Sequence, residues 1–66
     1  MYRKLFIAFD KKTMLFLSWD RDRNEHYWQK DDFRAYGFRS EHAAREEAVK
    51  LLGTSDAEER IVVTDS

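Results

Sequence analysis

The chain has 66 residues, enough for one small domain spanning 1–66, and it carries 12 Lys and Arg against 13 Asp and Glu. About 42% of the residues are hydrophobic and 38% are charged, which is a globular composition and not a disordered one. The absence of cysteine excludes disulfides, thiolate metal sites and cysteine nucleophiles. The longest apolar run, 5–9, is far shorter than the roughly 20 residues that span a bilayer. We therefore expect no membrane association, no signal peptide and a cytoplasmic location.

Two apolar segments near the start predict adjacent strands. Residues 3–9 are rich in aromatic and branched side chains, and residues 13–19 alternate in the same way, with a short polar connection between them. Ile7 and Leu17 are expected on the face that packs against the core. The side chains expected on the opposite face are Phe6, Ala8, Met14 and Phe16. Because both faces are apolar, we expect a partner, either a second copy or a target protein, to cover the second face by contacting Phe6, Met14, Phe16 and Trp28.

The middle of the chain is harder to assign. Residues 20–25 are polar throughout and predict a turn, and residues 26–29 predict a third strand. Residues 33–38 fit either an extended segment or a loop returning to the sheet. Gly37 would permit a positive φ or a bulge there.

Residues 40–52 form the clearest predicted helix. Ser40 is a good N-cap, and Gly53 suits the left-handed position after the last turn. Residues 55–58 have the pattern of a capping box, and residues 60–64 predict the last strand. The expected fold is a small α+β domain in the order β-β-β-α-β, with a three- or four-stranded, mainly antiparallel sheet and one helix on one face. The expected core consists of Ile7, Leu15, Leu17, Ala48, Leu51, Leu52, Ile61 and Val63.

No motif predicts catalysis, a cofactor or a metal. Asp20, Asp22 and Asn24 match the start of an EF-hand loop, but the later glycine and bidentate glutamate positions do not match. His26 and His42 are the only histidines and have no metal-binding spacing. Serine hydrolase and phosphate-loop motifs are also absent from the sequence. We therefore predict a protein that is not an enzyme.

Aromatic and cationic side chains are interleaved between residues 19 and 39. All ten aromatic residues precede residue 39, and residues 1–39 carry nine Lys and Arg against six Asp and Glu. Trp, Tyr and Arg are the residues that dominate protein interfaces, and the same types bind phosphates and bases. The candidates for a protein interface are Phe6, Met14, Phe16, Trp28, Arg34 and Tyr36. The candidates for nucleic-acid binding are Arg21, Arg23, Tyr27, Trp28, Lys30, Arg34 and Arg39.

The junction Gly37–Ala44 resembles the sheet-to-helix junction of AP2-like and integrase arm-type DNA-binding domains. The likeness covers about 15 residues, and it implies a three-stranded sheet that packs on one helix and reads DNA. This chain departs from that pattern by adding a strand after the helix and by lacking a strongly basic sheet. The junction is one that suits many sheet-and-helix domains, so no family is assigned from it.

The second part of the chain is acidic. Residues 40–66 carry three Lys and Arg against seven Asp and Glu. Such an acidic surface is a means by which small proteins of phages and mobile elements occlude a partner's nucleic-acid site. The function that we favour is therefore non-enzymatic protein binding, as a small inhibitor or adaptor, with a target protein or a second copy as partner. Nucleic-acid binding through residues 19–39 is the alternative, and the acids among its cations weigh against it.

Overall fold

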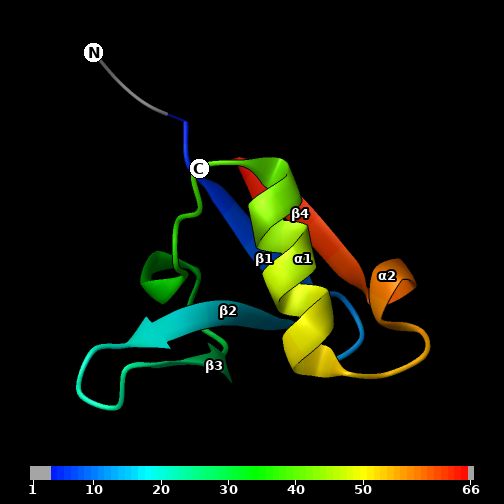
Figure 1. Cartoon of the computed structure of the whole chain (residues 1–66), viewed down its shortest axis with the longest axis horizontal. Helices are drawn as coiled ribbons and strands as arrows, with labels where there is room; N and C mark the ends of the chain where they lie inside the picture. Colours follow the sequence, from blue (N-terminus) through cyan, green and yellow to red (C-terminus); the bar gives the residue numbers. More distant parts are fainter. Residues whose placement is uncertain (1–3, 66) are drawn as a thin grey trace.

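A four-stranded antiparallel sheet with one long helix across one face forms the fold in the computed structural model, which describes residues 4–65 (Figure 1). The strand order is β3-β2-β1-β4, and two short helical turns join the elements. The elements are β1 (Phe6–Asp10), β2 (Leu15–Asp20), β3 (Glu25–Gln29), the 3-10 helix η1 (Asp32–Arg34), α1 (Glu41–Leu52), α2 (Ala57–Arg60) and β4 (Ile61–Asp65). The predicted α+β class and the order β-β-β-α-β are confirmed. None of the helices in residues 4–65 has the length and apolar character needed to cross a membrane.

Helix α1 begins and ends where its capping residues predict. The Ser40 side-chain oxygen accepts a hydrogen bond from the Ala43 backbone N–H at 3.0 Å. Gly53 has φ 66°, and its N–H donates to the Val49 carbonyl at 3.0 Å. The capping box predicted at residues 55–58 does not form, because α2 begins after Asp56 and no side chain caps its first turn.

Small side chains bring α1 close to the sheet. Ala8 from β1 and Ala44 and Ala48 from α1 are fully buried, and they share one cluster with Leu17 and Ile61. Alanine side chains let a helix and a strand approach closely, and the larger side chains then close the ends of the cluster. Burial of Leu17, Ala48 and Ile61 was predicted and is confirmed.

Two residues of the predicted core lie elsewhere. Leu51 is 42% exposed on the outer side of α1. Ile7 is on the sheet face away from the helix, since strand alternation puts Ala8 on the helix side. The physical reason is the close approach of α1, which requires the small Ala8 beneath it and so turns Ile7 to the other side.

The predicted second face is also corrected. Phe6 and Trp28 pack against the core cluster on the helix side, and Met14 lies in the turn between β1 and β2. Of the four side chains expected to meet a partner together, only Phe16 lies in the sheet face away from α1. Strand register places four half-buried apolar side chains there, which we call the open face: Ile7, Phe9, Phe16 and Val62.

A buried ion pair joins Asp10, at the end of β1, to Arg60, at the end of α2. The Asp10 side chain is 2% exposed, and its Oδ2 accepts from the Arg60 guanidinium at 2.6 Å. The Thr13 hydroxyl and the Lys12 N–H donate to the same carboxylate at 2.8 and 3.0 Å. The hydrogen bond from Arg60, with these two others, lowers the pKa of Asp10 from 3.8 to about 2.

The two hairpin turns share one design. Each turn begins with an aspartate whose carboxylate accepts hydrogen bonds from backbone N–H groups. Asp10 accepts from Lys12, and Asp20 accepts from Asp22 and Arg23. Each ends with a residue of positive φ, Met14 at 64° and Asn24 at 56°. Asp20, the first residue of the partial EF-hand match, therefore uses its carboxylate to stabilise a turn. Asparagine tolerates the left-handed region, whereas methionine does not.

Replacing Met14 with asparagine (Met14→Asn) is expected to raise the free energy of unfolding by about 1 kcal/mol, because a left-handed residue other than Gly or Asn costs about 1–2 kcal/mol. Met14 is 63% exposed, so its side chain loses little packing. Thermal unfolding should show a midpoint about 4–8 °C higher for a domain of this size. The reverse change, Asn24→Met, should lower the midpoint. An unchanged midpoint in both variants would show that the left-handed positions carry no strain.

The segment Ala35–Phe38 fills the gap where β1 and β2 diverge. Phe38 exchanges two backbone hydrogen bonds with Phe6 at 2.8 Å, and the Tyr36 N–H donates to the Leu17 carbonyl at 2.9 Å. The predicted positive φ at Gly37 is absent; a Cβ there would instead come within 2.8 Å of the Leu5 side chain. A larger residue at this position would therefore force the Leu5 side chain to move.

Candidate functional site: a groove of rings and carboxylates

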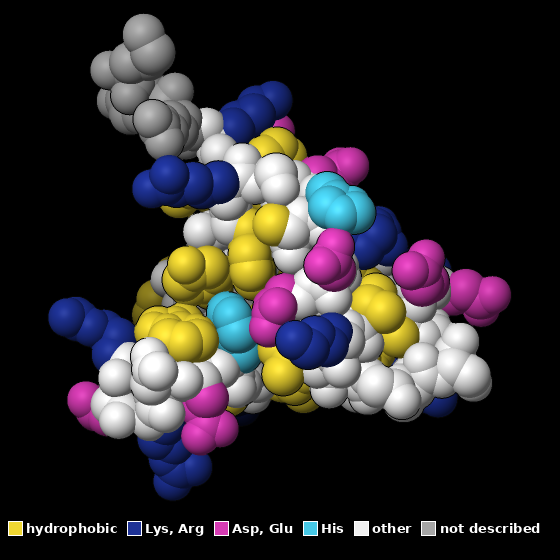
Figure 2. All heavy atoms as spheres, in the orientation of Figure 1, with side chains coloured by type: hydrophobic (Ala, Val, Ile, Leu, Met, Phe, Trp, Pro, Cys, Tyr) yellow, Lys and Arg dark blue, Asp and Glu magenta, His cyan; other side chains and the backbone are white. Residues whose placement is uncertain are grey.

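A groove of about 470 Å³ lies between α1 and the β2–β3 end of the sheet. Helix α1 crosses β1 and β4, while β2 and β3 extend away from it (Figure 1). The helix side of β2 and β3 is therefore only partly covered. Four rings line this area, and we call them the ring cluster: Trp19, His26, Tyr36 and Phe38. In Figure 2 hydrophobic side chains and a histidine meet acidic side chains of the helix at this place.

The ring cluster is a connected set of aromatic contacts. The ring centroids of Trp19 and His26 are 4.7 Å apart, and those of Tyr36 and Phe38 are 4.8 Å apart. His26 stacks on Phe38 at 5.7 Å with an interplanar angle of 24°. Strand pairing explains the first contact, because Trp19 and His26 are register partners on the helix side of β2 and β3. The other two rings, Tyr36 and Phe38, belong to the segment Ala35–Phe38.

One hydrogen bond orients the His26 ring. Its Nδ1 lies 3.1 Å from the Ser18 carbonyl oxygen, which only accepts, so Nδ1 carries a proton. In the neutral ring Nε2 is then an acceptor. Nothing within residues 4–65 donates a hydrogen bond to it. The ring therefore adds an acceptor to the groove as well as an aromatic surface.

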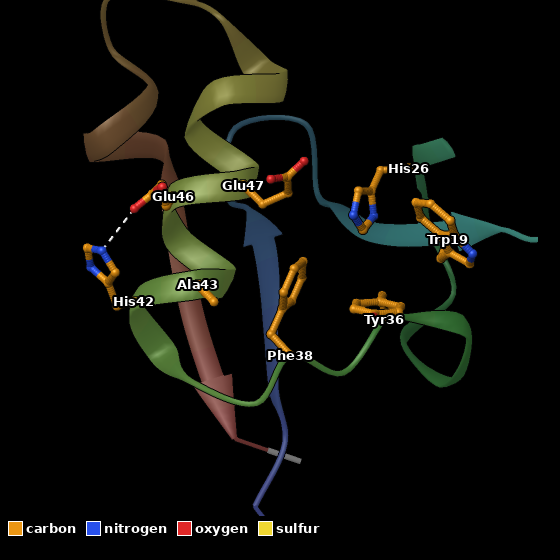
Figure 3. Close-up of a pocket in the computed structure, with 8 residues that line it drawn as sticks. All are labelled: Trp19, His26, Tyr36, Phe38, His42, Ala43, Glu46 and Glu47. Atoms are coloured by element: carbon orange, nitrogen blue, oxygen red, sulfur yellow. Dashed lines mark ion pairs between the residues drawn. The ribbon is translucent and has the colours of Figure 1, made fainter. Parts of the chain in front are cut away.

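The helix supplies the carboxylates of the groove. Glu46 and Glu47 follow each other in α1, but their side chains point to different flanks (Figure 3). Glu46 contacts His42 with 2.9 Å between Oε2 and Nε2, on the flank away from the rings. Glu47 extends on the flank of the ring cluster and is half-buried. Glu47 is therefore the carboxylate that faces the rings.

The structure separates the predicted protein-interface residues. Only Tyr36 lines the groove, where it is 40% exposed. Arg34 lies on η1, beside Asp31 at 3.7 Å and over the exposed ring of Phe33. Phe6 and Trp28 pack on the core, Phe16 belongs to the open face, and Met14 lies in the turn between β1 and β2.

Seven of the residues that line the groove were not predicted as interface residues: Trp19, His26, Phe38, His42, Ala43, Glu46 and Glu47. Trp19 and Phe38 belong to the aromatic segment that the sequence singles out, and alternation in β2 and β3 pairs Trp19 with His26. No local sequence signal points to Glu47, because it reaches the groove only through the docking of α1.

The nucleic-acid candidates do not gather in one place. Arg21 and Arg23 lie in the turn before β3, and Lys30 lies just after the end of the same strand. Arg39 precedes α1, and Trp28 packs on the core. Tyr27 is exposed on the sheet face opposite the groove, as strand alternation requires.

The acidic part of the chain is interrupted by cations. Arg45 donates to the Glu58 and Ile61 carbonyls at 3.3 and 3.2 Å, and Arg60 pairs with Asp10 and Asp56. A second hollow of about 360 Å³ on this flank of α1 is lined by acids together with Arg45 and Lys50. Its mixed charge gives it no preference for an ion of either sign.

Within residues 4–65, no group of three or more His, Asp or Glu side chains is placed to hold a metal ion. Comparison with protein-family models, with curated proteins and with solved structures found no match for this chain. The proposals below therefore depend on the geometry of the groove.

Proposed function

We propose that the protein is a non-enzymatic protein-binding module and that the groove beside α1 is its binding site. It would act as a small cytoplasmic inhibitor or adaptor by covering a surface of its partner. The observation that carries the proposal is a surface groove in which four rings stand beside a carboxylate. Rings of this kind supply large contact area at little entropic cost, which is why Trp and Tyr are frequent at interface hot spots.

The shape of the groove supports a macromolecular partner. It lies on the surface, between the helix and the sheet end, and is not enclosed by the fold (Figure 2). Its rings are already held in place by the Ser18 carbonyl and by the backbone pairing of Ala35–Phe38. A site ordered in advance binds without the cost of ordering its own side chains.

The change Tyr36→Ala is expected to weaken partner binding about 10-fold or more, since truncating a hot-spot ring costs about 2 kcal/mol or more. Tyr27→Ala is the matched control: Tyr27 is 39% exposed, against 40% for Tyr36, but lies on the opposite sheet face. Both variants and the parent chain would be used for affinity capture from nuclease-treated lysate of the source cell. A protein retained by the parent and by Tyr27→Ala, but not by Tyr36→Ala, would support the proposal.

Equal capture by all three chains would contradict a role for the groove. The alternative function, nucleic-acid binding, would appear as material that is recovered only from untreated lysate. In that case Arg21→Ala, Arg23→Ala and Arg34→Ala should reduce both the affinity and its salt dependence. Trp28 is not suitable for such a test, because its packing on the core makes a loss of folding the expected result.

A second copy of the chain is the other candidate partner, and the open face favours it. Phe9 and Phe16 are register partners with ring centroids 4.7 Å apart, and Val62 pairs with Phe9 on the other side. Small domains bury a limited part of their surface and often gain stability by association. Light scattering on the capture preparation would report a dimer directly, and Phe16→Ser should then restore the monomer.

A further inference from the structure

The groove presents negative charge and ring surfaces to the same space. The ring cluster forms one side and Glu47 stands on the other, while Glu46 also lines the groove but turns to His42. Among residues 4–65, no lysine or arginine lines the groove. Because its lining contains two carboxylates and neither lysine nor arginine, a cation is the complementary occupant.

We propose that the groove receives the guanidinium of an arginine side chain from the partner protein, an inference that rests on the proposed function. A guanidinium is flat and weakly hydrated, so it stacks on aromatic rings and still donates hydrogen bonds at its edge. Glu47 is the acceptor for that edge on the helix side, and His26 Nε2 is an acceptor on the sheet side. The groove therefore offers rings on which a guanidinium can stack and acceptors to which its edge can donate hydrogen bonds.

Other cations fit this lining less well. A quaternary ammonium has no N–H group and would leave both acceptors unused. A lysine ammonium donates hydrogen bonds but does not stack, because it is a compact and strongly hydrated charge. The free amino acid is also disfavoured, since its α-carboxylate would meet two glutamates and no cation in the lining. An arginine within a polypeptide has no such carboxylate.

The volume of the groove fits one long side chain and its flanking backbone. At about 470 Å³ it lies within the range of about 300–1,000 Å³ that is typical of small-ligand sites. A single exposed cation–π contact with one carboxylate supplies only modest free energy, so we expect a dissociation constant of about 1 mM for an isolated arginine peptide. The full partner would bind more tightly through its remaining contacts.

The test is an NMR titration of the intact chain with acetyl-Gly-Arg-Gly-amide. The two tryptophans provide an internal comparison, because Trp19 lines the groove and Trp28 packs on the core. We expect the Trp19 indole N–H signal to move with saturation and the Trp28 signal to stay. The citrulline peptide, which keeps the shape but lacks the charge, should bind about 10-fold more weakly. The lysine peptide and free arginine should each have an affinity at least about 3-fold lower than that of the arginine peptide.

Two variants assign the binding to the groove. Glu47→Gln keeps the size of the side chain and removes its charge, and it should weaken the arginine peptide about 5-fold. Glu59→Gln makes the same change on the exposed side of α2 and should leave the affinity unchanged. Equal binding of the arginine and citrulline peptides, or equal effects of the two variants, would overturn the proposal.

The outcome is separable from that of the proposed function. A partner captured through Tyr36, together with no Trp19 shift on adding the arginine peptide, would refute arginine recognition and leave the protein-binding function in place. A saturable Trp19 shift, without any Tyr36-dependent partner, would support arginine recognition and count against the proposed function.

Discussion

Replacing Asp10 with alanine (Asp10→Ala) is expected to lower the free energy of unfolding by about 3–5 kcal/mol, the usual effect of removing one member of a buried ion pair. The Asp10 carboxylate is 2% exposed and accepts bonds from Arg60, Thr13 and the Lys12 N–H. Its removal leaves the 13% exposed Arg60 with Asp56, 3.5 Å away, as its one remaining counter-ion among residues 4–65. A domain of this size has a total stability of about 3–10 kcal/mol, so the variant should lose a large part of its stability and unfold at a much lower urea concentration. Urea denaturation followed by tryptophan fluorescence measures the loss.

The pH dependence of folding gives an independent check on Asp10. Its pKa is about 2 in the folded chain and 3.8 ordinarily, so the unfolded chain takes up the proton first as pH falls. The resulting stabilisation, about 2 kcal/mol, is present above about pH 4 and disappears between about pH 4 and pH 2. Asp10→Asn keeps the size of the side chain and should remove this part of the acid transition. An Asp10→Asn variant with the parent's pH profile would contradict the assignment.

A surface ion pair supplies the contrast. Lys4 and Asp65 are 3.0 Å apart, but their side chains are 72% and 52% exposed. Solvent screens such a pair, and the entropy of its long side chain opposes it. Asp65→Ala should therefore change the unfolding midpoint far less than Asp10→Ala. Equal effects of the two substitutions would show that burial does not set the strength of the Asp10 pair.

The second large effect is expected for Leu17→Ala, with a loss of about 2–5 kcal/mol. Leu17 is the largest fully buried apolar side chain, and it touches the cluster formed by Ala8, Ala44 and Ala48. Those alanines have no side-chain freedom with which to fill the space, so a cavity should remain. Urea denaturation and the thermal unfolding midpoint both report the change.

Leu51→Ala is the matched control for Leu17→Ala. The same atoms are removed from a side chain that is 42% exposed on α1, so the expected loss is below about 1 kcal/mol. A large effect at Leu51 would mean that this side chain is covered in solution, for instance by a second copy of the chain. A small loss of stability for Leu17→Ala would mean that Ala8, Ala44 and Ala48 move into the vacated space.

Local signals were sufficient to predict the helix and the order of the elements. Ser40 and Gly53 delimit α1 because capping is a property of neighbouring residues. The hairpins also follow from local alternation, with polar turns between the strands. The faces of β1 do not, because Phe6, Ile7, Ala8 and Phe9 are all apolar and only the docking of α1 decides which side is inside.

Contacts between distant residues explain what could not be predicted. The burial of Asp10 depends on Arg60, which lies 50 positions later, and neither residue carries a local sign of the pairing. The groove combines rings from two strands and a connecting segment with a carboxylate of α1. Composition identified the aromatic segment around Tyr36, but a carboxylate such as Glu47 resembles any other exposed glutamate until the helix is placed.

The central position of β1 determines when the molecule becomes folded during synthesis. β1 is synthesised before one of its two neighbours, β4, and before the counter-ion of Asp10, because both lie at residues 60–65. Until that segment emerges, β1 has an unpaired edge, and Asp10 has no arginine beside it. Pairings so distant in sequence form late and slowly, and unpaired edges invite association with other chains. During synthesis this domain therefore depends on residues 60–65 to cover the open edge of β1.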